Sequence, residues 1–366
     1  MTDFVVVGGG MAGASAAAHL APHGSVVLVE TEPTMAFHTT GRSAALFIVN
    51  YGTEGSRPFA AASQAFLDNP PEGSADAPLL SNRGLLWVAD ATKITKLEEI
   101  SAGTGARLLD PGKAIDLVPA LRPERVAAAV HEPKARDIDV AALHQSYVRI
   151  ARSHGAEIRT GSPVTTIQRD GAGWTITTGQ ERISCGVVIN ASGAWGDETA
   201  QLAGVAPIGL QPMRRTAFMV PGSSAYHHWP MVAEADQQFY FKPDGVQFLC
   251  SLAEEEPCHP CDPKPRMEDV ALAIERINDF TTLRIRAVNS QWTGLRTFAP
   301  DRDLVIGEEP EAPGFFWLVG LGGIGIQTSP AYGSLLASLA TGSALPPELA
   351  AAGVDPAVVD PARFRV

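Results

Sequence analysis

The chain has 366 residues with 28 Lys and Arg against 40 Asp and Glu, a formal net charge of −12. Apolar residues make up 45% and charged residues 19%, which excludes a disordered chain and predicts a large buried core in two domains. The acidic balance excludes nucleic acid and anionic membranes as main partners, because both need a basic surface.

The first thirty residues predict one complete β-α-β unit. Residues 4–7 are an apolar run typical of a buried parallel strand, residues 14–20 are a helix of small residues, and residues 26–29 are a second strand that ends at Glu30. A polar segment over 38–43 follows this unit.

The rest of the chain alternates helix and strand signals. The expected elements, in chain order, are a helix over 58–67, a strand over 84–89, a helix over 140–154, strands over 157–160, 164–169, 174–178 and 186–190, antiparallel strands within 211–252, a helix over 269–280, strands over 282–287, 291–294 and 315–319, a helix over 327–341, and a solvated tail after Leu345.

Cysteine usage and the apolar runs predict a cytoplasmic location. Four cysteines in a chain of this length are not a disulfide framework and fit a reducing compartment. The first basic residue is Arg42, so the apolar N-terminus lacks the positive region of a signal peptide. The late apolar run over 314–326 is too short to cross a bilayer, so we expect no integral membrane protein.

Gly8, Gly10 and Gly13 match the G-x-G-x-x-G pattern of dinucleotide-binding loops, with a strand before them and a helix after. The first glycine permits the tight turn, the second lets a pyrophosphate approach the backbone, and the third lets helix and strand pack closely. Glu30 ends the next strand, where a carboxylate accepts hydrogen bonds from ribose hydroxyls. The pattern predicts a dinucleotide site, and a tight turn of another α/β protein is the alternative.

Two further loops offer close approach to a cofactor. Residues 190–195 end a predicted strand, and residues 320–325 are a glycine loop before the last long helix. The start of that helix presents a positive dipole end to the flavin edge that becomes negative on reduction. The loops therefore favour FAD over NAD, which the first glycine loop by itself does not distinguish.

Collinear motifs over nearly the whole chain point to one family. They are Gly41-Arg42-Ser43-Ala44-Ala45, Tyr51-Gly52-Thr53, Asp68-Asn69-Pro70-Pro71, Leu210-Gln211-Pro212 with Arg214-Arg215, Phe239-Tyr240 with Lys242-Pro243-Asp244, Gly294-Leu295-Arg296, and Gly322-Gly323 with Gly325-Ile326-Gln327-Thr328-Ser329. On these motifs the chain resembles FAD-dependent D-amino-acid dehydrogenases of the glycine/D-amino-acid oxidase (DAO) superfamily, and among them the bacterial D-arginine dehydrogenases.

The resemblance implies a two-domain α/β fold. A Rossmann-like FAD-binding domain is assembled from discontinuous segments, 1–80, 136–205 and 300–366, and a substrate-binding domain with a mainly antiparallel sheet is formed by 81–135 and 206–299. The flavin is expected to be non-covalent, because relatives with a covalent flavin use a late cysteine and no cysteine follows Cys261. No metal is expected. The cofactor-binding residues that follow from the glycine loop and the resemblance are Gly8, Gly10, Met11, Ala12, Gly13, Glu30, Thr40, Gly41, Arg42, Ser43, Ala44, Val164, Ala191, Gly193, Trp195, Gly322, Gly325, Ile326, Gln327 and Thr328.

The resemblance also implies a substrate cage. Arg215 and Arg296 bind the substrate carboxylate with help from Tyr51 and Tyr240, and the Gly323 carbonyl meets the amino group. A guanidinium holds a carboxylate bidentately and so fixes the α-carbon. The alternatives are surface ion pairs for the arginines, with Arg214 turned inward in place of Arg215, and core packing for the tyrosines.

Two departures from the arginine-specific relatives bear on the side-chain pocket. Leu85 stands where they have a glutamate for the substrate guanidinium, and Leu46 stands where they have a histidine, with Ile48 in place of a nearby threonine. An unpaired charge against leucine is costly. With Met231, these residues predict a pocket for apolar side chains, and plain core packing of Leu46 and Leu85 is the alternative.

The expected reaction is the oxidative deamination of a small-molecule D-amino acid. A hydride equivalent passes from Cα to flavin N5, and the imino acid hydrolyses to a 2-oxo acid and ammonia. No lysine lies in the strand over 246–251, although Lys242 precedes it, which favours a dehydrogenase with a quinone or another acceptor. The alternatives are an oxygen-using glycine, sarcosine or D-amino-acid oxidase, and a non-catalytic flavin-binding subunit.

Two further signals are interpreted as structural, and a third is left open. The Cys258-His259-Pro260-Cys261 segment lacks the second ligand pair of a zinc site. His144 is expected to be an ordinary residue of its helix. His38 lies near the polar segment, and its sequence context leaves open whether it meets the cofactor.

Overall fold

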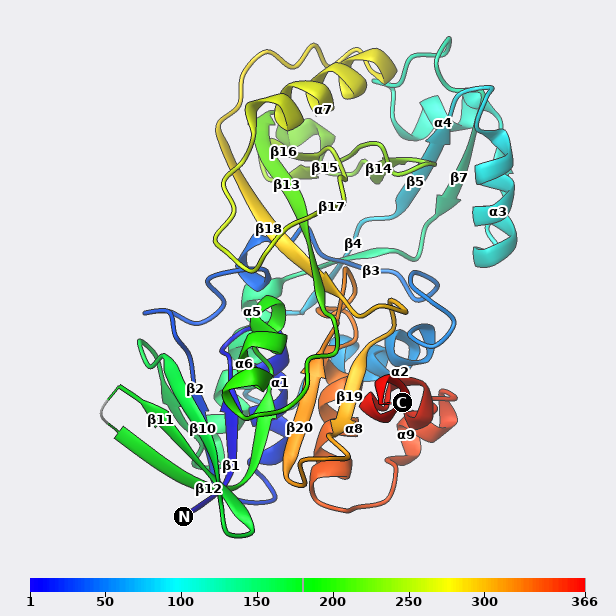
Figure 1. The fold of residues 1–366 in the computed structure, drawn as a ribbon. Coiled ribbons are helices and arrows are strands. Elements are labelled where there is room, and N and C mark those ends of the chain that lie inside the picture. Colours follow the sequence, from blue (N-terminus) through cyan, green and yellow to red (C-terminus); the bar gives the residue numbers. More distant parts are fainter. Residues whose placement is uncertain (180, 366) are drawn as a thin grey trace.

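The computed structural model of the protein describes residues 1–179 and 181–365, and its strands form two large sheets and one small sheet. In Figure 1 one large sheet lies in the lower half of the molecule and the other in the upper half. Each sheet collects strands from separate stretches of the chain. The mixed α/β fold predicted from the sequence is confirmed.

The lower sheet has a parallel centre that carries the glycine loop. Its parallel strands are, in order, β9 (Glu157–Arg159), β2 (Val26–Val29), β1 (Thr2–Val7), β12 (Glu181–Asn190) and β20 (Phe315–Val319). The antiparallel strand β19 (Val305–Glu308) borders β20, and the hairpin of β10 (Val164–Asp170) and β11 (Gly173–Thr178) extends from β12. Strand β20 is apolar and buried along its whole length, as expected for a strand covered on both faces.

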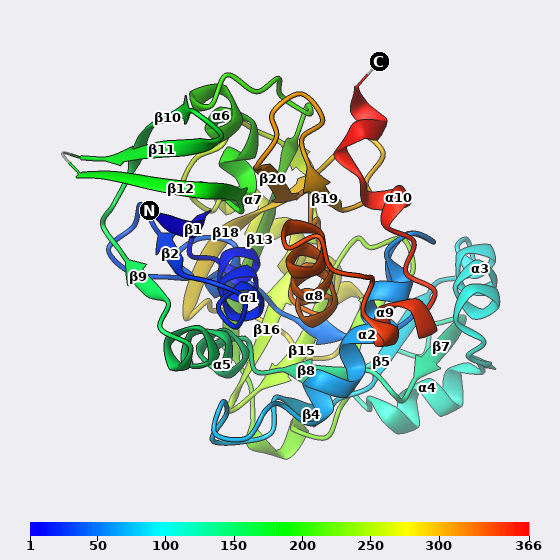
Figure 2. The ribbon, with the colours of Figure 1, turned by 90° about the horizontal axis from the view of Figure 1, so that it is seen from below.

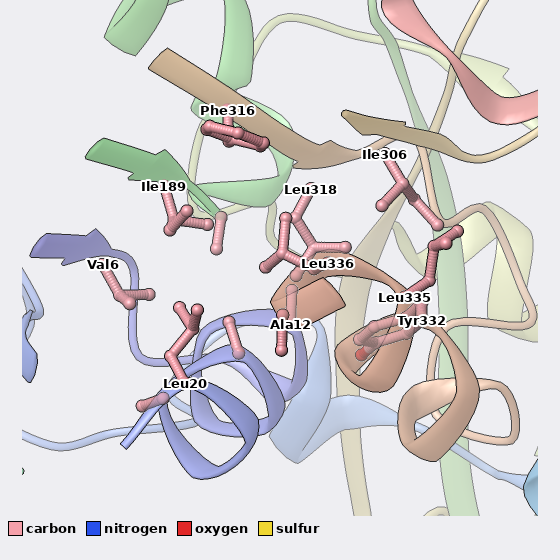
Figure 3. Packing of buried hydrophobic residues seen from close by; sticks show 14 of the residues in the cluster. Val6, Ala12, Leu20, Ile189, Ile306, Phe316, Leu318, Tyr332, Leu335 and Leu336 are labelled. Carbon is pink, nitrogen blue, oxygen red and sulfur yellow. The ribbon is translucent and has the colours of Figure 1, made fainter. Parts of the chain in front are cut away.

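Helices cover the lower sheet and bury its apolar side chains. They are α1 (Met11–Leu20), α2 (Arg57–Asp68), α5 (Val140–Ser153), α8 (Ser329–Ala340) and, at the other side of β12, α6 (Gly196–Leu202). Figure 2 shows α1 and α8 side by side beneath the strands. Figure 3 shows side chains of both helices, among them Leu20 and Leu336, meeting Val6, Ile189 and Leu318 of the strands.

The upper sheet is antiparallel except for one parallel pair, β14 with β5. Its order is β17 (Glu256–Pro257), β13 (Gln211–Pro221), β16 (Gln247–Ser251), β15 (Tyr240–Asp244), β14 (Met231–Glu234), β5 (Leu85–Ala89), β7 (Ala128–Glu132) and β6 (Leu108–Leu109), with β18 (Ser290–Phe298) paired to β13. One face packs on the helices α7 (Met267–Phe280) and α4 (Pro111–Leu117), while α3 (Ile94–Thr104) lies at the β5–β7 end.

A three-stranded sheet lies between the two large ones: β3 (Leu46–Phe47), β8 (Arg136–Ile138) and β4 (Leu80–Asn82). Asp137 of β8 accepts hydrogen bonds from Lys242 Nζ of β15 at 2.7 Å and from Arg83 Nε at 2.6 Å. This partly buried triad ties the small sheet to the upper sheet. Short 3-10 turns complete the chain at Thr40–Arg42, Gly193–Trp195, Ser224–Tyr226 and Pro361–Phe364.

Two predicted features are wrong. Residues 282–287 form no strand, because the Asn278 side chain accepts a hydrogen bond from the Ile285 N–H at 2.8 Å and so satisfies the backbone locally. The tail after Leu345 is not solvated: it forms α9 (Pro347–Ala351) and α10 (Pro356–Val359). Leu349 and Val359 are fully buried, because they pack into the core of the lower half.

The division of the chain into an FAD-binding domain, 1–80, 136–205 and 300–366, and a substrate-binding domain, 81–135 and 206–299, stays a proposal. Within the described residues, no helix has both the length and the apolar character that crossing a membrane requires.

Candidate active site

The turn between β1 and α1 accepts only glycine at two of its positions. Gly8 has a φ of +110°, and a Cβ there would lie 2.5 Å from the Ala191 carbonyl oxygen. A Cβ at Gly13 would lie 1.8 Å from the Gly8 carbonyl oxygen, so the third glycine sets the close contact of helix and turn. A Cβ at Gly10 would meet only the Thr40 hydroxyl, at 3.3 Å, so this glycine leaves open space instead.

The difference between Gly10 and Gly13 gives the first prediction. Gly13→Ala is expected to lower the free energy of unfolding by about 3 kcal/mol or more, because the added carbon overlaps backbone that has no room to move. Gly10→Ala is expected to leave urea unfolding of the cofactor-free protein unchanged but to weaken FAD binding roughly tenfold or more. Flavin fluorescence titration measures the second effect. Equal FAD affinity in Gly10→Ala and wild type would contradict a phosphate contact at this glycine.

Hydrogen bonds fix the loop and its acidic neighbour. Glu30 Oε2 accepts from the Gly9 N–H at 2.5 Å and Oε1 from the Glu32 N–H at 2.8 Å, so the carboxylate is held at the end of β2. His144 Nε2 lies 3.0 Å from the Gly9 carbonyl oxygen. Burial lowers the pKa of His144, so the ring is neutral and donates to the loop. Gly9 and His144 were not predicted, because only the folded chain brings α5 under the loop.

A cavity of about 520 Å³ opens at this loop and is lined from both halves of the protein. Sixteen of the twenty predicted cofactor residues line it: Gly8, Gly10, Met11, Ala12, Glu30, Thr40, Arg42, Ser43, Ala44, Val164, Ala191, Gly193, Trp195, Gly322, Gly325 and Ile326. Gly13, Gly41, Gln327 and Thr328 do not. Gln327 instead accepts a hydrogen bond from the Ile48 N–H at 2.8 Å, and Thr328 donates one to the Ile324 carbonyl at 3.0 Å. Both residues therefore stabilise the backbone of neighbouring segments.

The cavity fits a dinucleotide. Gly10 and Gly193 leave room where any side chain would project, next to N–H groups at the start of α1 that are suited to phosphates. The ring of His38 packs on Trp195 with centroids 4.7 Å apart, and His38 Nε2 lies 2.9 Å from Glu32 Oε1. His38 lines the cavity, where it could meet a bound cofactor.

Two arginines lie close together at this cavity, and one of them also lines a second cavity. On the paired strands β13 and β18, Arg215 lies opposite Gly294 and Arg296 opposite Met213, so the arginines are diagonal neighbours on one face. Arg215 lines the first cavity, and Arg296 lines both. The adjacent Arg214 donates to the Lys264 carbonyl at 2.7 Å and lines neither cavity, which places Arg215 as the inward residue.

The other predicted cage residues converge on the same place. Tyr240 lines the first cavity, and Tyr51 lines the second, which has about 530 Å³. Gly323 lines both, and a Cβ on it would lie 3.0 Å from an Arg296 nitrogen, so its backbone abuts that guanidinium. The cage predicted for the substrate is thus assembled from the loop after β3, from β13, β15 and β18, and from the last glycine loop.

The charge of the cage is unbalanced. Arg215 donates to Glu255 Oε1 at 3.2 Å, and Glu255 is shared with Arg302 at 2.8 Å. Burial and the nearby charge of Arg296 lower the pKa of Arg215. Arg215 Nε is buried without an acceptor, and Arg296 makes no ion pair within 1–179 and 181–365. A carboxylate ligand would satisfy these donors.

The four predicted pocket residues, Leu46, Ile48, Leu85 and Met231, belong to one apolar cluster with Tyr240. Only Ile48 lines the second cavity, and the other three line neither of the two cavities. Leu85 and Met231 are buried in the upper sheet, which agrees with the core-packing alternative for Leu85.

Comparison with known proteins identifies the family. The sequence profile of the DAO family, FAD dependent oxidoreductases, matches residues 3–339. The chain belongs to this family. The chain is 23% identical to mitochondrial sarcosine dehydrogenase of Homo sapiens over 365 residues. The match covers 92% of this chain and 39% of that protein. The oxidoreductase thus spans about two fifths of the length of this curated relative.

Solved structures show the same fold. L-proline dehydrogenase from P. horikoshii has a TM-score of 0.85 at 21% identity, and the match covers 99% of this chain and 97% of that chain. Glycine oxidase from Geobacillus kaustophilus has a TM-score of 0.82 at 22% identity and coverage of 94% and 95%. The narrower likeness to D-arginine dehydrogenases is not confirmed by these comparisons.

Cys258 and Cys261 are free thiols on the loop after β17, and burial raises the pKa of Cys258. Within the described part of the chain, no group of three or more His, Cys, Asp or Glu side chains is placed to hold a metal ion.

Proposed function

We propose that this FAD-dependent oxidoreductase oxidises the α-amino group of D-amino acids, giving a 2-oxo acid and ammonia. The observation that carries the proposal is the cage: Arg215 and Arg296 face one shared space, and Glu255, the carboxylate that pairs with Arg215, is shared with Arg302. A flavin carrier without its own chemistry has no need of such a cage. The D configuration rests on the resemblance alone.

The names of the similar proteins support an amino-acid substrate. Sarcosine, glycine, L-proline and L-amino acids all carry an amine one carbon away from a carboxylate. Two arginines fit the carboxylate common to all of them, whereas the configuration at the α-carbon differs among them. The cage therefore supports an α-amino acid more strongly than it supports one configuration.

Each residue of the cage has one task in this proposal. Arg215 and Arg296 bind the substrate carboxylate, and the Tyr51 and Tyr240 hydroxyls donate to the same oxygens. The Gly323 carbonyl accepts from the amine and orients it. The glycine-lined cavity would hold FAD non-covalently, and the flavin would supply the acceptor for the hydride equivalent that leaves Cα. Orientation by these groups supplies much of the catalysis.

Lys242 supports a dehydrogenase with a quinone or another acceptor. Lys242 is buried, and its Nζ lies 2.7 Å from Asp137 Oδ1. It lines neither cavity, so its ammonium group pairs with Asp137 and does not face the proposed cofactor site. Ile48, which lines the second cavity, supports a substrate side chain whose body is apolar. The cytoplasmic location stays a prediction of the sequence.

The test is anaerobic mixing of the FAD-loaded protein with a panel of D- and L-amino acids, followed by flavin absorbance. We expect rapid bleaching by D-amino acids and none by their L forms. Bleaching by L forms alone would overturn the configuration, and bleaching by no amino acid would overturn the proposed substrate class. Stoichiometric hydrogen peroxide under air would show an oxidase in place of a dehydrogenase.

A further inference from the structure

The second cavity contains a carboxylate that the proposed reaction does not use. Glu132 of β7 lines this cavity together with Tyr51 and Arg296. Its Oε1 accepts a hydrogen bond from Trp87 Nε1 at 2.8 Å. Its Oε2 receives no hydrogen bond from the described residues and is not enclosed, so it is available to a ligand in the cavity.

Glu132 forms no ion pair with any cation of the described residues. Of the cations that line its cavity, Lys96 pairs with Glu99 at 3.1 Å and Arg302 with Glu255 at 2.8 Å, while Arg57 and Arg296 form no ion pair with the described residues. Burial raises the pKa of the Glu132 carboxyl, as expected for a carboxylate withdrawn from water without a compensating charge. A carboxylate in such a place is stabilised by a ligand that brings a positive charge.

Glu132 and the arginines of the cage lie on strands far apart in the upper sheet. Arg296 is on β18, which pairs with β13, whereas the strands β16, β15, β14 and β5 lie between β13 and β7. Arg296 and Glu132 nevertheless line the same cavity of about 530 Å³. A substrate anchored by its carboxylate at the arginines therefore reaches Glu132 only with a long side chain.

The lining of this cavity includes apolar side chains, among them those of Ile48, Ile100 and Ile324. The indole of Trp87 lines the cavity beside the carboxylate. Methylene groups pack well on such a wall, while a terminal charged group continues to the carboxylate, as lysine and arginine side chains do elsewhere in proteins.

We infer that Glu132 is a specificity-determining residue which binds the cationic end of a long substrate side chain, so that basic D-amino acids are preferred over apolar ones of the same length. The inference rests on the proposed function and amends the predicted preference for apolar side chains. Position 85 holds no glutamate, and Glu132 on the neighbouring strand β7 supplies the carboxylate instead.

The experiment compares D-lysine with D-norleucine, which has the same four-carbon chain without the terminal amine, in anaerobic reduction of the FAD-loaded protein. We expect the wild type to favour D-lysine by about ten- to a hundredfold in reduction rate over Kd, the range of a hydrogen bond between charged groups. Glu132→Gln keeps an acceptor for Trp87 and is expected to remove this ratio while D-norleucine is unaffected. Glu132→Asp keeps the charge and is expected to retain part of the ratio.

Glu99→Gln is the matched control, because it makes the same chemical change in an exposed residue of the same cavity. We expect it to change the ratio less than twofold. A wild type that does not distinguish the two substrates, or a ratio that survives in Glu132→Gln, would overturn the inference and leave the proposed function standing. Failure of both amino acids to reduce the flavin would instead overturn the proposed function and the inference with it.

Discussion

Arg215→Met is expected to reduce the rate of flavin reduction over Kd by roughly a hundred- to a thousandfold for every substrate amino acid. Removing one member of a desolvated charge pair costs about 2–5 kcal/mol, and each 1.4 kcal/mol is about a factor of ten. The loss should be the same for D-lysine and D-norleucine, because both carry the carboxylate that Arg215 binds. Stopped-flow absorbance measures it.

The same substitution is expected to leave the stability unchanged or to raise it. Burial and the neighbouring charge of Arg296 disfavour the charged form of Arg215, as its lowered pKa shows. Glu255 keeps its other partner, Arg302, when Arg215 is replaced. Lost activity without lost stability is the mark of a residue retained for binding. Urea unfolding of the same preparation gives this second measurement.

Arg214→Met is the control, since it alters the neighbouring residue on the opposite face of β13. Its flavin reduction should stay within about threefold of the wild type, and its stability should fall, because Arg214 holds the Lys264 carbonyl. Normal reduction by Arg215→Met, or a greater loss in Arg214→Met, would show that the carboxylate is bound elsewhere.

Arg214 and Arg215 show how much of the site can be predicted from the sequence. Side chains alternate between the faces of a strand, so one of the pair had to face inward, but the sequence does not say which face of β13 is turned to the cofactor. The pairing of Arg215 with Gly294 and of Met213 with Arg296 decides it. Those partners lie about eighty positions along the chain, beyond the reach of a local pattern.

Glu132 also could not be predicted as a pocket residue from the sequence, because its position depends on strand pairing. Comparing position 85 with relatives finds leucine and predicts an uncharged pocket, yet the residue opposite Leu85 is a glutamate. By contrast, the glycine loop was located correctly, since its strand, turn and helix are contiguous in the sequence. The C-terminal tail was misjudged because Leu349 and Val359 are isolated apolar residues among Ala and Pro, and only the core they pack into gives them a role.

Asp137→Ala is expected to lower the free energy of unfolding by about 3–5 kcal/mol, the range for breaking a buried ion pair by removing one partner. Lys242 and Arg83 both lie on this carboxylate, and the exposed fractions of the three side chains are 17%, 10% and 12% for Asp137, Lys242 and Arg83. The substitution leaves two neighbouring cations with no counter-charge. Urea unfolding followed by circular dichroism measures the loss.

The control is Asp76→Ala, which breaks the exposed pair of Asp76 with Arg149 and should leave the unfolding curve unchanged. An equally small effect of Asp137→Ala would show that water reaches the triad. Replacing Asp137, Lys242 and Arg83 together by leucine and two methionines should restore most of the stability, because no charge then remains buried. Since Lys242 would be lost in that variant while the cage is untouched, retained flavin reduction there would show that the lysine holds the sheets together and takes no part in the oxidation.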